Sequence, residues 1–233
     1  MASMQTTASP LVTIAMRYSA SARAKRVESL SKHVKLEPDN LVLDLGGGTG
    51  DHFHSIFPDH RKVVIADILE DDLRQARERH GYETVQLVDG IGTLPFPDQN
   101  FDFVFCSSVL EHVTGPKDAV EWTRSGPYFE TTGRQHQWAF ANEIRRIAKR
   151  YYVQTPYRYF ILESHSWLPG LIVFLPRPAL VALLRLTNTF WPKQTSPDWR
   201  LLTIGEFSAM FPEAKIEREK SLGFVKSLMA IKA

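Results

Sequence analysis

The stretch Leu41–Gly50, LVLDLGGGTG, constrains the fold of this chain more than any other feature. A short apolar run leads directly into a glycine-rich turn, which is typical of a buried strand followed by a tight turn. Glycines at such a place let the backbone approach a ligand that a β-carbon would exclude. Asp51 stands where the dinucleotide-binding pattern G-x-G-x-x-G has its third glycine. A carboxylate there, together with Asp44 inside the strand, disfavours a pyrophosphate and favours a cationic ligand.

Strand-like and helix-like segments then alternate along the chain. Residues 63–66 form a second β-branched run, and the helical pattern after it ends at Gly81. Such alternation predicts an α/β fold, a mostly parallel sheet covered by helices on both faces. Thr203 and Glu206 have the spacing of a capping box at the start of a helix. The other predicted elements are an N-terminal amphipathic helix at 20–34, strands at 84–88, 101–106, 151–154, 215–218 and 227–231, and a helix at 138–148.

Length and composition predict a single domain, residues 1–233, with an N-terminal helical segment at 1–35 and an insertion at 156–200. A formal charge of +2 argues against a nucleic-acid partner, and the single cysteine excludes an internal disulfide. The polar N-terminal residues do not resemble a signal peptide, so we expect a cytoplasmic protein. Prolines and arginines divide the apolar stretch 167–191, so we do not expect it to span a membrane.

Two acidic residues stand at the carboxyl ends of predicted strands. Asp67 ends the second strand, where a carboxylate can accept both hydroxyls of a ribose. Asp89 ends the third, where it can accept from the amine of an adenine lined by Gly90 and Ile91. The alternative for either residue is a helix N-cap, a position that favours aspartate.

Taken together, LVLDLGGGTG, Asp67, Asp89 before LPFPDQNFDFVFCSSVLEHV, and EIRRIAKRYYVQTP resemble the class I S-adenosylmethionine-dependent methyltransferases. The resemblance is to the small-molecule group that contains the ubiquinone-biosynthesis-type enzymes, and it extends from Val42 to Pro156, roughly half of the chain. It implies a doubly wound, mostly parallel seven-stranded sheet whose antiparallel last strand, here 227–231, lies between the fifth and sixth. It also implies S-adenosylmethionine as cofactor, S-adenosylhomocysteine as product and a small-molecule acceptor.

The resemblance further implies a role for individual residues in holding the cofactor. Around the methionine part it places Asp44, Gly46, Gly48 and Gly50; at the ribose, Asp67; at the adenine, Asp89 and Gly90; and beside the transferable methyl group, Cys106 and Ser107. Ile68, which follows Asp67, is a further candidate for cofactor binding.

The acceptor side is less constrained by the sequence. His112, Glu163 and His165 are the candidate catalytic residues, with packed, hydrogen-bonded histidines as the alternative. The insertion at 156–200 is predicted to cap the acceptor pocket, and residues 118–135 to add a loop to it. Its aromatic side chains either line that pocket or pack the insertion onto the sheet: Tyr157, Tyr159, Phe160 and Trp167. The sequence spacing shows no metal-ligand cluster, so we expect no metal.

These patterns favour an enzyme that transfers a methyl group to a small, hydrophobic or aromatic molecule by in-line displacement, on oxygen, nitrogen or carbon. The segment CSSV has no Asn-Pro-Pro-aromatic motif, which argues against methylation of adenine or glutamine amides. Contact with a membrane surface is conceivable from the apolar insertion but is not predicted. Two alternatives stay open: an NAD(P)-dependent oxidoreductase, and a non-catalytic, cofactor-binding regulatory protein.

Overall fold

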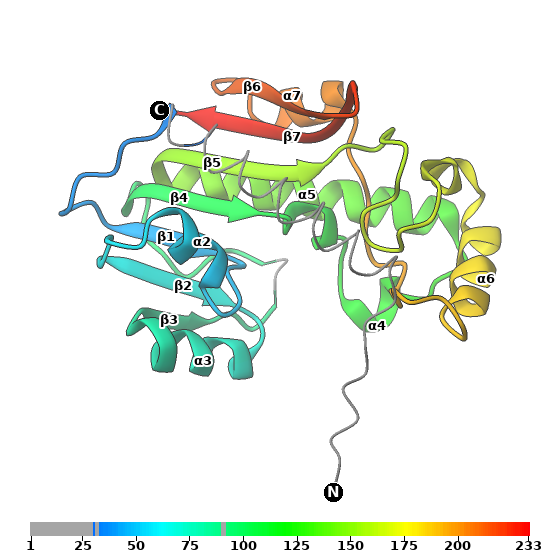
Figure 1. Cartoon of the computed structure of the whole chain (residues 1–233), viewed down its shortest axis with the longest axis horizontal. Helices are drawn as coiled ribbons and strands as arrows, with labels where there is room; N and C mark the ends of the chain where they lie inside the picture. The colour runs from blue at the N-terminus through cyan, green and yellow to red at the C-terminus, as the bar shows by residue number, and fades with distance from the viewer. Residues whose placement is uncertain (1–29, 31–32, 90–91) are drawn as a thin grey trace, which may run out of the picture. The chain divides into compact units, whose positions relative to one another are not determined.

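A computed structural model describes residues 30, 33–89 and 92–233, and within them residues 36–233 form one compact unit. Seven strands of this described part form one sheet (Figure 1). In sheet order they are β3 (Glu83–Gln86), β2 (Val63–Asp67), β1 (Val42–Leu45), β4 (Phe101–Ser107), β5 (Ala148–Pro156), β7 (Phe224–Lys232) and β6 (Lys215–Ser221). The helices are α2 (Asp51–Ile56), α3 (Glu70–His80), η1 (Leu110–His112), α4 (Lys117–Val120), α5 (Gly126–Ile147), η2 (Gly170–Phe174), α6 (Arg177–Thr187) and α7 (Ile204–Met210).

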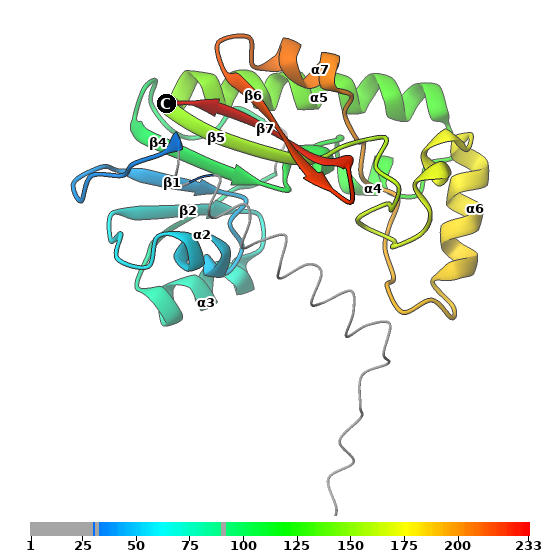
Figure 2. The ribbon, with the colours of Figure 1, turned by 45° about the horizontal axis from the view of Figure 1, so that its top comes forward.

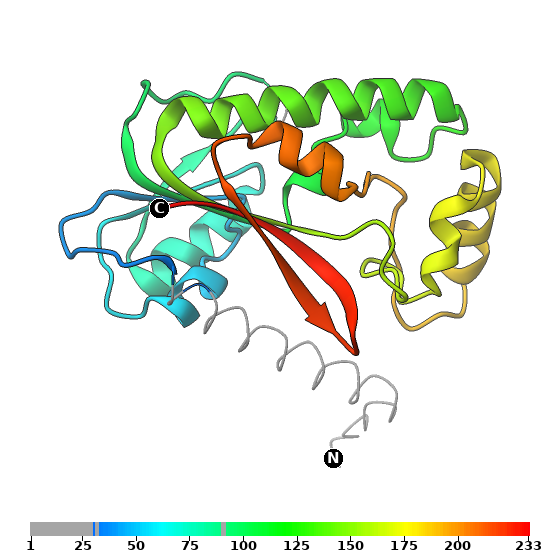
Figure 3. The ribbon, with the colours of Figure 1, turned by 90° about the horizontal axis from the view of Figure 1, so that it is seen from above.

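The sheet has the predicted topology. β1 pairs in parallel with β2 and β4, whereas β7 lies antiparallel between β5 and β6. All four residues of β1 are buried, as expected of a central strand covered on both faces. Figure 3 shows α5 and α7 on one face of the sheet and α2 on the other. The chain order reverses between β1 and β4, the place where open α/β sheets bind ligands beyond the carboxyl ends of their strands.

The residues predicted to end one helix and to begin another are confirmed. Gly81 ends α3 in the left-handed region with φ 70°, and its N–H donates to the carbonyl of Arg77. Thr203 and Glu206 form a reciprocal capping box at the start of α7. β3, however, ends at Gln86, two residues before the predicted end, and Val88 is fully exposed. The predicted helix at 20–34 lies almost wholly outside the described residues.

The prediction of a loop at 118–135 is wrong, because most of this segment is helical. α5 begins at Gly126, twelve residues before the predicted start, and the hydroxyl of Ser125 accepts the N–H of Tyr128 as its N-cap. A proline in the first helical turn is compatible with this start. Gly133 is buried within α5, and a β-carbon there would lie 3.0 Å from Cδ of Arg200. The glycine therefore makes room for a buried arginine rather than breaking the helix.

The insertion at 156–200 lies beyond the carboxyl ends of β4 and β5, where Figure 2 shows α6 standing apart from the strands. It has a small apolar core of its own, in which Leu168, Leu184 and Trp199 are buried together. Arg177, buried at the start of α6, donates to the carbonyls of Val120 and Pro197 and joins the insertion to the α4 region. Within the described part of the chain, no helix has both the length and the apolar character needed to cross a bilayer.

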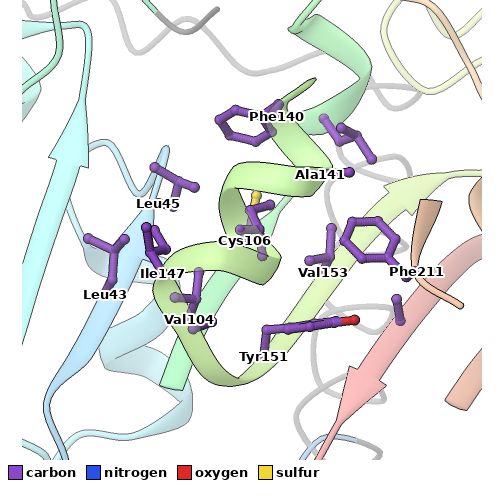
Figure 4. Close-up of a cluster of buried hydrophobic side chains, with 14 of the residues drawn as sticks. Leu43, Leu45, Val104, Cys106, Phe140, Ala141, Ile147, Tyr151, Val153 and Phe211 are labelled. Carbon is purple, nitrogen blue, oxygen red and sulfur yellow. The ribbon is translucent and has the colours of Figure 1, made fainter. Parts of the chain in front are cut away.

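The main hydrophobic core lies between the sheet and α5. Figure 4 shows Cys106 of β4 facing Phe140 and Ala141 of α5 in this cluster, with Val104 of the same strand and Val153 of β5. The core thus fixes β4 and β5 against α5, and it holds the carboxyl ends of these strands at a common edge.

Candidate functional site

The glycine turn after β1 is shaped by its neighbours. Gly46 has φ 71°, and a β-carbon there would lie 2.4 Å from Cγ2 of Val109. Its N–H donates to the carbonyl of Ala66 at 2.7 Å. Gly46 therefore lets the end of β1 approach both β2 and the segment after β4. At Gly48, with φ 54°, the nearest atom to an added β-carbon is Oδ2 of Asp72 at 3.5 Å, so this part of the turn is open.

Asp67, at the end of β2, connects this turn to α3. Its Oδ2 accepts the N–H of Gly48 at 2.8 Å, and its Oδ1 accepts the N–H of Leu69 at 3.1 Å. The bond to Leu69 is the kind that a residue at a helix start makes, which agrees with the N-cap alternative. The bond to Gly48 instead connects Asp67 to the glycine turn. An ionised carboxylate has about four acceptor positions, so the same side chain can still accept ribose hydroxyls.

Asp44 lies beneath the turn and is 2% exposed. Its Oδ2 is buried without a hydrogen-bond partner among the described residues. Burial, helped by the charge of Asp67, raises the pKa of Asp44 to about 8. A buried carboxylate that lacks a partner is costly, and a cationic ligand beside it would stabilise its ionised form. The residues present therefore fit the sulfonium or ammonium group of S-adenosylmethionine.

A cavity of about 520 Å³ opens at this edge of the sheet. Its wall includes Gly46, Asp67, Ile68 and Asp89, and on the other side His112. Asp89 is exposed, and its Oδ1 accepts the N–H of Gly92 in a local turn. Its role toward adenine stays a prediction, and Gly90 and Ile91 lie outside the described residues.

The thiol of Cys106, predicted to lie beside the transferable methyl group, is not among the side chains that line the cavity. Cys106 is completely buried in the hydrophobic core, and burial raises the pKa of its thiol well above the ordinary value. The adjacent Ser107 and Ser108 occupy the strand end instead, and both hydroxyls donate to Oε1 of Gln154 at 2.9 Å. Alternation along a strand explains the difference, because Cys106 and Ser107 point to opposite faces.

The structure brings the three candidate catalytic residues into one cluster, which we call the His–Glu cluster: Glu111, His112, Glu163, His165 and Asp198. The rings of His112 and His165 meet edge to face with centroids 4.8 Å apart. Nδ1 of His165 lies 2.7 Å from Oε1 of Glu163, and Nδ1 of His112 lies 3.1 Å from Oδ1 of Asp198. Sequence reasoning missed Glu111, although it precedes His112. It also missed Asp198, 86 residues away, which no local signal could have connected to His112.

The titratable side chains of the His–Glu cluster strongly affect one another's pKa values. Burial disfavours the imidazolium form of His165, but the carboxylates of Glu111 and Glu163 outweigh this effect and raise the pKa of His165 to about 9. Burial likewise opposes ionisation of Asp198, yet His112 and Lys117 hold the pKa of Asp198 well below its usual range.

Glu163 is a positioning residue in this geometry. The peptide N–H groups of His165 and Ser166 and the hydroxyl of Ser166 all donate to its carboxylate, at 2.6–2.8 Å. Both of its oxygens are thereby engaged within its own turn, and the side chain is fully buried. Of the three candidates, His112 alone lines the cavity described above.

The four aromatic residues predicted to bind the acceptor do not share one place. Tyr157 and Tyr159 meet edge to face, and Tyr159 also stacks on Phe174. Phe160 is buried, which agrees with the packing alternative, while Trp167 contacts Lys193 through its ring. They are not among the residues lining the cofactor-side cavity or a second cavity, of about 350 Å³, whose wall is formed by the start of α5 and the insertion.

Comparison with known proteins agrees with this architecture. Residues 42–125 match the family described as methyltransferase domain. The ubiquinone/menaquinone biosynthesis C-methyltransferase UbiE of Ectopseudomonas mendocina is 41% identical over 93 residues, which are 36% of each chain. That of Hydrogenovibrio crunogenus is 36% identical over 94 residues, 37% of each chain. The chain thus covers little more than a third of the length of these relatives.

Solved structures share the fold at low identity. The YcgJ protein of Bacillus subtilis superposes with a TM-score of 0.52 and 17% identity, covering 86% of this chain and 71% of that one. A SAM-dependent methyltransferase from Archaeoglobus fulgidus gives a TM-score of 0.51 and 14% identity, covering 90% and 94%. The chain therefore has the seven-stranded, Rossmann-like fold that these methyltransferase structures share. Residues 42–125 thus resemble the S-adenosylmethionine-dependent methyltransferases, including those of the ubiquinone-biosynthesis type, and this resemblance supports S-adenosylmethionine as the cofactor.

Proposed function

We propose that this protein transfers the methyl group of S-adenosylmethionine to a small, hydrophobic or aromatic molecule. The observation that carries the proposal is the buried carboxylate of Asp44, whose Oδ2 has no hydrogen-bond partner within the described structure and lies beneath an open glycine turn. A cationic cofactor in the adjacent cavity supplies the missing charge.

Asp44, Gly48 and Asp67 would hold the cofactor in this proposal, and Ile68 and Asp89 would contact its base and ribose. When bound, the sulfonium supplies an activated methyl group. The chain's residues would hold the nucleophilic oxygen, nitrogen or carbon of the acceptor in line with that methyl group, and the acceptor's proton would pass to a nearby base or to water. The chain chiefly has to align the acceptor. Alignment can lower the barrier by about 7–11 kcal/mol, against roughly 3–5 kcal/mol from a general base.

His112 is the residue we assign to the acceptor. Its ring forms part of the cavity wall and is held by Asp198, so it is oriented toward the space where an acceptor meets the methyl group. Glu163 and His165 then act through the arrangement of the cluster rather than by touching the acceptor.

The apolar character of the acceptor is inferred from the insertion. Of the fourteen large hydrophobic side chains that are exposed in the described chain, eight lie at 156–200: Tyr159, Ile161, Leu162, Leu171, Phe174, Leu175, Leu186 and Phe190. Single exposed hydrophobic residues are normal, but their concentration in one segment is typical of an interaction surface. This composition favours a lipid-like or aromatic acceptor over a strongly polar one.

Transfer of labelled methyl from S-adenosylmethionine tests the proposal directly. With a panel of quinols, phenols, fatty acids and polar amines, we expect label in organic-extractable products. His112→Gln should lower the rate of transfer at unchanged affinity for S-adenosylhomocysteine, while His80→Gln, at the end of α3, serves as the matched histidine control. Tight binding of S-adenosylhomocysteine without transfer to any acceptor would favour the non-catalytic alternative.

A further inference from the structure

Three side chains of the His–Glu cluster have possible metal-ligand atoms that lie close together. One donor atom from each of Glu111, His112 and His165 lies within 4.8 Å of the other two. Because residues 111–112 and 165 are far apart in the sequence, their spacing could not indicate a shared site. The fold joins them by placing η1, after β4, against the insertion that follows β5.

A hydrogen-bond partner holds one atom of each of these three side chains. Thr155 donates to Oε2 of Glu111 at 3.0 Å, Asp198 binds Nδ1 of His112, and Glu163 binds Nδ1 of His165. The remaining atoms are Oε1 of Glu111 and one ring nitrogen on each histidine. Histidines that bind metals almost always have their second nitrogen held by a carboxylate or a carbonyl in this way.

Oε1 of Glu111 is an independent sign of a missing ligand. Glu111 is 0% exposed, and this oxygen has no hydrogen-bond partner among the residues described. Nε2 of His165 is 3.8 Å away, beyond hydrogen-bond distance. A buried carboxylate oxygen without a partner is costly, and a cation between Glu111 and the two histidines would remove that cost.

The charges of the cluster also suit a dication. Three carboxylates, those of Glu111, Glu163 and Asp198, face two ammonium groups, those of Lys117 and Lys193. Metal binding requires neutral histidines, so the ion displaces the proton of His165, and the cluster then carries a net charge of −1.

We propose that Glu111, His112 and His165 bind a divalent transition-metal ion of the zinc or iron(II) type. Two imidazoles and one carboxylate form a set of three protein ligands that leaves coordination positions open. Zinc ligands lie about 2.0–2.2 Å from the metal in a tetrahedral arrangement, so that ligand atoms are roughly 3.4 Å apart. The three ligand atoms, which lie within 4.8 Å of one another here, need to approach by up to about 1.4 Å. Magnesium and calcium, which prefer oxygen ligands, fit this set poorly.

The inference does not depend on methyl transfer, because its readout is metal binding. The full chain, treated with a chelator and dialysed, is titrated calorimetrically with Zn²⁺ and separately with Mg²⁺. We expect one equivalent of Zn²⁺ at submicromolar Kd and no comparable binding of Mg²⁺. Glu111→Gln and His165→Gln should each weaken Zn²⁺ binding at least tenfold. His80→Gln, which removes a histidine paired with the exposed Asp51, should leave it unchanged.

A crystallographic measurement on the wild-type protein tests the proposal even if a variant fails to fold. Crystals soaked in Zn²⁺ should show an anomalous-scattering peak between Glu111, His112 and His165. Absence of that peak at full soaking, or wild-type affinity no higher than that of a folded Glu111→Gln variant, would overturn the assignment. Titration with S-adenosylhomocysteine in parallel reports whether the cofactor cavity is intact, and it separates failure of the metal site from failure of the proposed methyl transfer.

Discussion

Replacing Asp44 by Asn tests two effects of the buried carboxylate: the stability that its ionisation costs and the ligand affinity that its charge provides. In the ligand-free protein the pKa of Asp44 is raised from 3.8 to about 8. The folded state therefore binds more protons than the unfolded state between these values, and stability falls as pH rises through this window. Each pH unit corresponds to about 1.4 kcal/mol for one proton. From pH 5 to pH 8 the wild type should thus lose up to about 4 kcal/mol that Asp44→Asn does not lose.

Urea denaturation at pH 5, 6, 7 and 8 measures this difference. Without ligand, Asp44→Asn should become progressively more stable relative to the wild type as pH rises. With saturating S-adenosylmethionine the wild type should regain stability relative to Asp44→Asn, because the cation stabilises the ionised carboxylate. The affinity of the wild type for this ligand should rise with pH for the same reason. Asp59→Asn, at an exposed carboxylate, is the control. A parallel pH dependence for wild type and Asp44→Asn would refute the reasoning.

Two further substitutions probe the glycine turn and its carboxylate. Asp67→Ala should weaken S-adenosylhomocysteine binding about ten- to a hundredfold, from loss of roughly 1.5–3 kcal/mol in charged hydrogen bonds. Calorimetry measures this loss against the exposed α3 variant Asp71→Ala, and an unchanged affinity would remove Asp67 from the site. Gly46→Ala combines a left-handed φ with a 2.4 Å approach to Val109, so it should cost about 2–5 kcal/mol of unfolding free energy. Gly81→Ala has a similar φ and open space around it, so about 1–2 kcal/mol is expected; equal losses would contradict the packing role of Gly46.

The sheet could be predicted because its signals are local and repeated. Apolar runs, the glycine turn and the capping box at Thr203 each describe a few neighbouring residues, and their alternation restricts the topology. The start of α5 could not be found in this way. Gly133 is an unfavourable helical residue whose presence depends on Arg200, and that contact exists only in the folded chain.

The same distinction between local and long-range signals applies to the residues of the candidate site. Asp44 and Asp67 follow from their positions at strand ends, where the fold itself brings them to the cavity. The His–Glu cluster depends on the insertion folding back onto η1, so Asp198 carries no signal before that contact forms. Cys106 shows the limit of a motif, because a one-residue difference along β4 directs its side chain into the core.

The structure of the protein crystallised with S-adenosylhomocysteine tests the central claim most directly. We expect the ribose hydroxyls within hydrogen-bond distance of Asp67, the amino-acid end of the ligand against the turn at Gly46–Gly48, and its ammonium group on the side of Asp44. A ligand bound elsewhere, or a cavity beside Asp67 that stays empty at saturating concentration, would contradict the account.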